Sequence, residues 1–239
     1  MGKPIMSQRR GKGSPSFKAR STWFKAEVEY RTYDDKEKGL LRFEIIDLVD
    51  DPGRSALLMK VKYEDGTVLF LPAPEGAMVG QVLEEGYNAS LGIGNILPLE
   101  KIPEGYPIFN IETVIGDGGS LVRASGAIAY VVNKSGEQVL VKLPSGQMKY
   151  FDGRSRVTIG NVCGGGRTEK PMLKAGVGYY QAIARGHWYP TVRGVKMNAY
   201  DHPFGGKQHH GAITPKGVGG APGQHVGSFG ARRTGRRKR

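Results

Sequence analysis

Cysteine is almost absent from this sequence: Cys163 is the single thiol in 239 residues. One thiol cannot form an intramolecular disulfide, and it excludes a metal site built from several cysteines. No apolar run approaches the roughly eighteen residues that cross a bilayer, so no membrane association is predicted. The N-terminus is basic but lacks the apolar core of a secretory signal. These absences together favour a cytoplasmic protein.

Acidic residues are nearly missing from both ends of the chain. Residues 1–20 contain six Lys or Arg and no acid, and residues 185–239 contain eleven Lys or Arg and one acid, Asp201. Residues 21–184 carry eighteen cations and twenty-one acids, so the net charge of +13 resides in the two ends. The second end also lacks apolar periodicity and cannot build a core. We expect a partner with dense negative charge, such as folded RNA, to order it.

The composition of these ends favours RNA over the alternative that they are solvated tails. Glycine lets a backbone approach phosphates closely, and aromatic faces can stack on unpaired bases. The aromatic residues interleaved with the cations are Phe17, Trp188, Tyr189, Tyr200, Phe204 and Phe229.

Between the two ends the pattern is typical of short strands separated by tight turns, and the 37 glycines disfavour long helices. The first strands are predicted at 40–49, 56–63, 67–71 and 77–83, with a hairpin turn at 64–66. They suit a small barrel of the OB type. A second set is predicted at 108–115, 126–132, 137–143, 147–151 and 156–159, with turns at 133–136 and 144–146. This set suggests an SH3-like barrel, followed by one short helix within 169–184 that Gly176 and Gly178 weaken.

The sequence therefore predicts a mainly β protein, an OB-fold barrel followed by an SH3-like barrel, with extended basic N- and C-terminal arms. Four parts are expected. They are a basic N-terminal arm (1–30), an OB-fold RNA-binding domain (31–90), a linker with the SH3-like barrel domain (91–185), and an extended glycine-rich basic C-terminal arm (186–239).

The glycine-rich stretch 116–119 resembles a dinucleotide-binding loop but lacks its third glycine, because Leu121 stands there. A strand pattern follows it instead of a helix, so no nucleotide cofactor is predicted. We expect a tight loop that lets an RNA backbone come close.

No catalytic or metal site is predicted. No histidine lies in the barrel region, so Cys163 lacks a base and is interpreted as a structural thiol. Adjacent Asp201 and His202 do not form an acid–base pair merely by adjacency, and a histidine that donates one hydrogen bond to RNA fits better. A metal site is the alternative, but no strong zinc spacing joins the candidate residues, which are Asp201, His202, His209, His210 and His225.

The turn at 51–53 precedes Arg54 and Ser55, and it permits two interpretations. An arginine at a loop tip beside a hydroxyl is a plausible phosphate contact. Equally, Arg54 could pair with Asp50 or Asp51.

Five segments resemble the universal large-subunit ribosomal protein L-two family, and they occur in family order. They are DPGRSA (51–56), GNILPL (94–99), IPEG (102–105), GGSLVRASG (118–126) and, most specific, TVRGVKMNAYDHPFGG (191–206). The last is similar to a family pattern TVRGxxMNPxDHPxGG, and His202 occupies the position of the histidine in that pattern. Ala199 and Phe204 depart from the bacterial Pro and second His, which together with GGKQHHG (205–211) indicates the archaeal and eukaryotic branch.

The resemblance implies that the protein is a structural constituent of the large ribosomal subunit in the cytoplasm. It also implies that the protein is not an enzyme and needs no cofactor. It implies both arms threaded into large-subunit rRNA, with the 191–206 loop approaching the peptidyl transferase region during translation. Neighbouring ribosomal proteins, and the small subunit at an intersubunit bridge, are the other implied partners. Two alternatives are a two-barrel factor that binds nucleic acid transiently, and an enzyme that uses Asp201 and His202.

The predicted rRNA-binding residues are mostly cations of the arms and of barrel loops. In the arms they are Arg9, Arg10, Lys12, Lys18, Arg20, Arg185, Arg193, Lys196, Asn198, His202, Gly205, Gly206, Lys207, Arg232, Arg233, Arg236 and Arg237. On the barrel side, up to the start of the predicted helix, they are Arg54, Ser55, Arg123, Lys142, Lys149, Arg154, Arg156, Arg167 and Lys174.

Overall fold

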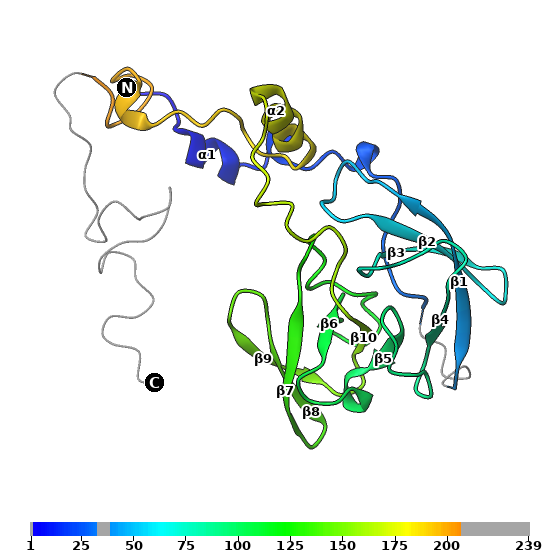
Figure 1. Ribbon diagram of the computed structural model, residues 1–239. Coiled ribbons are helices and arrows are strands. Elements are labelled where there is room, and N and C mark those ends of the chain that lie inside the picture. Colours follow the sequence, from blue (N-terminus) through cyan, green and yellow to red (C-terminus); the bar gives the residue numbers. More distant parts are fainter. Residues whose placement is uncertain (1, 33–38, 207–239) are drawn as a thin grey trace. The chain divides into compact units, whose positions relative to one another are not determined.

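The chain forms two compact units (Figure 1). The sheet unit is Ser21–Leu173, and the terminal unit joins Met1–Arg20 to Lys174–Arg239. The computed structural model describes residues 2–32 and 39–206. Within these residues, no helix has the length and apolar character that a membrane span requires. The sheet unit starts at Ser21, and the predicted domain boundaries at 30, 90 and 185 stay predictions.

The prediction of a mainly β protein is confirmed. Ten strands of the described residues form one continuous sheet, in the order β3-β2-β1-β4-β5-β10-β6-β7-β8-β9. The strands are β1 (Leu41–Val49), β2 (Leu58–Tyr63), β3 (Val68–Pro72), β4 (Val82–Glu85), β5 (Ile96–Pro98), β6 (Pro107–Phe109), β7 (Ala129–Ser135), β8 (Gln138–Lys142), β9 (Met148–Asp152) and β10 (Arg156–Ile159).

In the first half of the sheet, β1, β2 and β3 form an antiparallel meander, β4 adds to the other edge of β1, and these strands surround their own core. β1 pairs with both β2 and β4, and β2 pairs with β3. Phe43 and Ile45 of β1 are buried while Glu44 between them is exposed, which is the alternation expected of a strand with one face on a core. The predicted turn at 64–66 joins β2 to β3, where Gly66 has a φ of +87°. A non-glycine residue would be strained in that conformation.

The second half repeats the arrangement with β7, β8 and β9 around a separate apolar core. Two predicted strands and one predicted turn differ from the observed ones. The strand predicted at 77–83 begins at Val82, because a turn with Gly80 at a φ of +84° precedes it. The strand predicted at 108–115 ends at Phe109, because Asn110 has a φ of +49°. The turn predicted at 133–136 is shorter, because β7 continues to Ser135.

A buried charge cluster of Arg156, Glu85 and Glu112 lies where the two halves meet. Arg156 on β10 binds Glu112 Oε1 through Nη2 at 2.8 Å and Glu85 Oε1 through Nη1 at 3.0 Å. All three side chains are less than a tenth exposed. Tyr63 donates to the second oxygen of Glu85 at 2.5 Å. The cluster ties β4 and β2 of the first half to β10 of the second.

Residues 28–30 lie against the sheet unit instead of extending away from it. Val28 and Tyr30 are buried, and the Tyr30 hydroxyl donates to Asn110 O at 2.6 Å. Tyr30 N also donates to Gly118 O at 3.0 Å, and a Cβ on Gly118 would lie 2.9 Å from that of Glu29. The 116–119 loop is tight as predicted, but the backbone that it brings close is the chain's own.

The terminal unit is made of short helices and connecting backbone. It contains α1 (Met6–Gly11), η1 (Pro15–Phe17), α2 (Ala175–Ala184) and η5 (Gly194–Lys196), whereas η2 (Ser21–Trp23) and η4 (Leu99–Lys101) belong to the sheet unit. The N-terminal arm is thus partly helical, and the predicted helix begins at Ala175. Gly186 meets the backbone of Lys18 so closely that an added Cβ would lie 2.4 Å from its carbonyl carbon.

Candidate nucleic-acid interface

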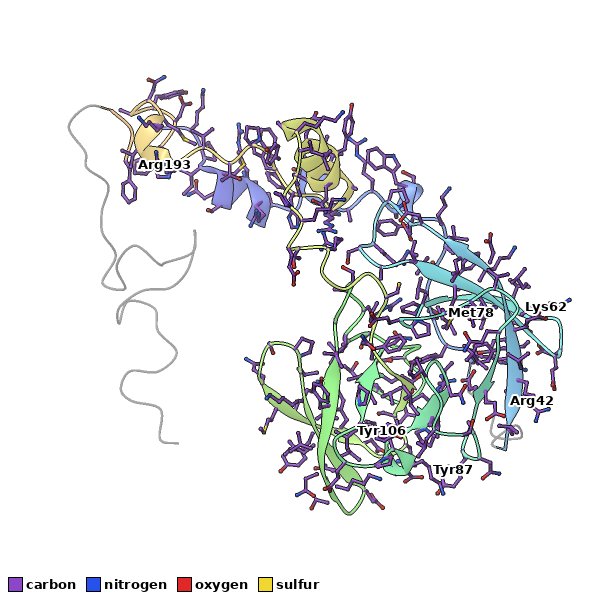
Figure 2. The ribbon with its side chains drawn as sticks, viewed as in Figure 1. Arg42, Lys62, Met78, Tyr87, Tyr106 and Arg193 are labelled. Carbon is purple, nitrogen blue, oxygen red and sulfur yellow. The ribbon has the colours of Figure 1, made fainter. Side chains whose placement is uncertain are left out.

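The two ends of the chain build a cationic groove of about 800 Å³ within the terminal unit. Its walls are the start of the chain through α1 and the 188–202 segment. Five cations line it: Lys3, Arg9, Arg10, Arg193 and Lys196. Arg193 is labelled in Figure 2. The groove brings together predicted RNA contacts from both ends, including Asn198 and His202.

Lys3 links the first residues of the chain to the 188–202 segment, which forms the other wall of the groove. Lys3 N donates to Tyr200 O at 2.9 Å, and Lys3 Nζ lies 3.0 Å from Asp201 Oδ1. Its ammonium group also lies 4.9 Å from the centre of the Tyr200 ring. Asp201 is the only acid among the described residues that line the groove, so this ion pair leaves the other cations for an anionic partner.

The loop that carries His202 closes on itself because two glycines allow close approach. A Cβ on Gly194 would lie 2.2 Å from His202 Nδ1, and one on Gly205 would lie 2.2 Å from Asn198 O. Gly205 N donates to His202 O at 2.9 Å, and Gly206 N donates to Met197 O at 3.1 Å. The predicted contacts Gly205 and Gly206 therefore shape the loop through their backbones.

The hydrogen bonds of His202 fix which ring nitrogen carries the proton. Nδ1 accepts from Phe204 N at 3.1 Å, so in the neutral ring the hydrogen is on Nε2. The ring is half-buried and packs edge-on against Phe204, with 5.2 Å between ring centres. Asp201 pairs with Lys3 instead of orienting the imidazole. His202 is thus arranged as a hydrogen-bond donor.

A second, smaller pocket of about 360 Å³ lies between the N-terminal arm and α2. Lys18 and Arg20 line it, as do the aromatic side chains of Tyr179, His187, Trp188 and Tyr189. Trp188 lines both this pocket and the groove. Of the other predicted contacts in the terminal unit, Lys12 directly follows α1, and Lys174 and Arg185 are the residues that flank α2.

The sheet unit gathers another predicted set around Ser125. Ser125 N donates to Ser55 Oγ at 3.1 Å, and Arg167 Nε donates to Ser125 Oγ at 2.9 Å. The 51–55 loop, the 123–125 segment and Arg167 therefore meet, although they are distant in sequence. Arg167 is exposed.

Arg54 and Arg123 bind the chain's own backbone. Arg54 Nη1 donates to Ala26 O at 3.1 Å and pairs with Asp51, so the ion-pair interpretation of Arg54 holds for Asp51. Arg123 Nη2 donates to Val28 O at 2.6 Å. Burial, and then the positive charge of Arg54, lower the pKa of Arg123. The two arginines hold residues 26–28 against the sheet unit.

Arg156 is the most deeply enclosed of the predicted contacts in the sheet unit. Its side chain is 8% exposed, and it is enclosed by Glu85, Glu112 and the Arg31 carbonyl, which accepts from Nη1 at 2.8 Å. Burial acts to lower the pKa of Arg156, but the two carboxylates hold it above its usual value. Two buried carboxylates already pair with this guanidinium, so the structure gives it a role inside the sheet unit, and its contact with rRNA stays a prediction.

The remaining barrel-side predictions are exposed cations on neighbouring strands. Lys142 on β8 lies opposite Met148 of β9, next to Lys149, whose Nζ is 4.9 Å from the Phe151 ring centre. Arg154 follows β9 and pairs with Asp152 at 3.3 Å. Outside the described residues lie Lys207, Arg232, Arg233, Arg236 and Arg237, together with His209, His210 and His225 of the metal alternative.

Cys163 is half-buried, and its Sγ lies 3.9 Å from Leu57 O. Burial raises the pKa of the thiol, which favours its protonated, less nucleophilic form. This agrees with the structural thiol that the sequence predicted.

Sequence reasoning missed Lys3 as a member of the groove and did not place Trp188 at a particular site. Lys3 and Asp201 are 198 positions apart, so no local pattern could have paired them.

Family models match nearly the whole chain. One described as "Ribosomal Proteins L2, RNA binding N-terminal domain" matches residues 3–85, and one described as "Ribosomal Proteins L2, C-terminal domain" matches residues 92–225. The chain belongs to the ribosomal protein L2 family. Its members are structural, RNA-binding proteins of the large ribosomal subunit, which confirms the predicted family and the prediction of a non-enzyme.

Full-length relatives of the archaeal type agree. The chain is similar to large ribosomal subunit protein uL2 of Methanocaldococcus jannaschii, with 50% identity over all of both chains. The corresponding proteins of Methanothermobacter thermautotrophicus and Methanopyrus kandleri are 46% and 45% identical over at least 98% of each chain. The two family domains and the mainly β structure together support the predicted OB-fold barrel followed by an SH3-like barrel.

Proposed function

We propose that this chain is a structural constituent of the large ribosomal subunit, where it binds rRNA and supports subunit association and the architecture of the peptidyl transferase region. The observation that carries the proposal is the cationic groove, in which both ends of the chain present Arg and Lys side chains with one paired acid. Neighbouring ribosomal proteins and the small subunit are the other proposed partners.

Counterion release supplies the affinity in this proposal. The terminal unit contains eighteen Lys or Arg and one acid, a net charge of +17. Neutralising about eight phosphates would make the logarithm of the binding constant fall with the logarithm of salt at a slope of about −6 to −7. The sheet unit adds exposed cations, for which we propose Lys142, Lys149, Arg154 and Arg167.

The 191–206 loop is the segment that we propose lies near the peptidyl transferase region. His202 would offer its Nε2 hydrogen to an rRNA acceptor, because Nδ1 is occupied by Phe204 N. This supports a role in holding rRNA geometry without proton transfer. Ribosomes carrying His202→Gln, which retains a donor, should form peptide bonds with an unchanged pH profile. Normal assembly together with lost peptide-bond formation and an altered pH profile would contradict this role.

Sedimentation of a cell lysate through sucrose at moderate and then high salt tests the function as a whole. We expect the chain to comigrate with the large subunit and to leave it only at high salt, if at all. A large free pool, or release at modest salt, would favour the alternative of a transient nucleic-acid-binding factor.

A further inference from the structure

Trp188 forms part of the walls of two neighbouring cavities. It lines the groove of about 800 Å³ and the pocket of about 360 Å³. The residue is 46% exposed, and the centre of its ring lies 6.2 Å from that of Phe17, with the two rings tilted by 30°. A large aromatic residue is thus held by one neighbour while much of its surface stays open to a ligand.

The groups on each side of Trp188 are aromatic rings and cations. In the pocket they include Tyr179, Tyr189 and Arg20, and in the groove they include Arg9 and Arg193. Aromatic faces flanked by cations are the chemistry that binds single-stranded nucleic acid, since bases stack on the rings while phosphates meet the charges. Both volumes lie in the range of about 300–1,000 Å³ typical of sites for small molecules.

The charge of the walls selects against other ligands. Asp201 is the only acid among the described residues that line either cavity, and Lys3 already pairs with it. A basic peptide would therefore find no free carboxylate there. A paired RNA helix would present phosphates but no open base faces for the rings.

We propose that Trp188 is a stacking platform for an unpaired stretch of RNA, with one base in the pocket, another in the groove and the connecting phosphates on the flanking arginines. The proposal rests on the proposed rRNA-binding function and names the form of RNA that this surface takes. It assigns base stacking, in addition to charge, to the terminal unit.

Fluorescence of the full chain tests this directly, because Trp23 and Trp188 are the two tryptophans. In a Trp23→Phe parent, a short single-stranded oligoadenylate should quench Trp188 in a saturable way. Inorganic polyphosphate should bind without comparable quenching, because it carries charge but no base. Equal quenching by both ligands would overturn the proposal.

Substitutions separate stacking from packing. Trp188→Leu should weaken oligoadenylate binding about tenfold, an effect typical of losing one stacked base, and should leave polyphosphate binding unchanged. Trp188→Phe keeps a ring and should bind within about threefold of the parent. Tyr180→Leu is the matched control, since Tyr180 is an exposed aromatic of the same unit that lines neither cavity. A Trp188→Leu chain that binds oligoadenylate like its parent would refute stacking, as would a Trp188→Phe chain as weak as Trp188→Leu.

Failure of the stacking proposal can be told apart from failure of the proposed function. If the chain is not a ribosomal rRNA binder, the wild type itself will not comigrate with the large subunit. If only stacking is wrong, the wild type will comigrate and Trp188→Leu will bind oligoadenylate undiminished.

Discussion

The two units of this chain are held in their folds by different forces. The sheet unit has seventeen Lys or Arg against twenty-one acids and contains three clusters of buried apolar side chains. The terminal unit has eighteen cations against one acid, and Ala184 is the one buried apolar side chain in its described part. One unit is stable because it removes apolar surface from water. In the described part of the other unit, every cation except the half-buried Arg185 is exposed, which suits a polyanionic partner.

Several acidic residues of the sheet unit form ion pairs with arginines of the same unit. Glu85 and Glu112 enclose Arg156, and Asp51 pairs with Arg54. Cations of this unit are thus partly used to hold it together. In the terminal unit, Asp201 is the only acid, so most cations there have no acidic side chain of their own unit to pair with.

The largest expected effect on the sheet unit comes from Arg156→Met. Removing the guanidinium leaves Glu85 and Glu112 buried without their cation, so we expect a loss of about 3–5 kcal/mol in unfolding free energy. Denaturant unfolding followed by Trp23 fluorescence in a Trp188→Phe background measures it. Adding Glu85→Gln and Glu112→Gln should recover much of the loss. A loss below about 1 kcal/mol for Arg156→Met alone would show that the cluster does not join the two halves.

A smaller effect is expected in the terminal unit from Gly194→Ala. The new Cβ would lie 2.2 Å from His202 Nδ1, so the loop should be destabilised by about 1–3 kcal/mol. Hydrogen exchange of the Gly205 and Gly206 amides, which are bonded within this loop, should become correspondingly faster. Gly11→Ala is the control, because its Cβ would meet nothing within 4 Å. Equal exchange in both variants would contradict the tight contact with His202.

The smallest effect concerns the pH dependence that Glu85 gives to the sheet unit. Burial raises the pKa of Glu85 above its ordinary value of 4.5, so the folded state binds a proton more tightly than the unfolded state. The stability contributed by this proton is present below pH 4.5 and is lost as the pH rises through the raised pKa. Between pH 4 and 8, the unfolding free energy of the wild type should therefore fall relative to that of Glu85→Gln as the pH rises. A shift in the opposite direction would mean that Arg156 outweighs burial.

How much the sequence could predict also differs between the two units. In the sheet unit, alternation and turn residues located β10 at 156–159 and the hairpin at 64–66, because both signals are local. The same reasoning did not anticipate the ion pairs of Arg156, since an arginine in a strand carries no local sign of two acids that approach from positions 85 and 112.

In the terminal unit the charge indicated an RNA partner but not the shape of the site. The groove depends on Lys3 meeting Tyr200 and Asp201, a contact between the two ends of the chain. The orientation of His202 depends on Phe204 N, and the space for its ring depends on Gly194. Such contacts follow from the folded backbone, so composition alone could not supply them.

We attribute the affinity for RNA to the terminal unit and not to the sheet unit. The salt dependence of binding to large-subunit rRNA tests this assignment most directly. The full chain would be compared with a variant whose six cations in residues 1–20 become Gln, and with a control carrying Arg42→Gln, Lys62→Gln and Lys101→Gln in the sheet unit. Each cation that contacts a phosphate contributes about 0.9 to the slope of the logarithm of the binding constant against the logarithm of salt. We therefore expect this slope to become shallower by up to about 5 in the variant of residues 1–20 and to change very little in the control. An unchanged slope in the arm variant, or an equal loss per charge in the control, would contradict the assignment of RNA affinity to the terminal unit.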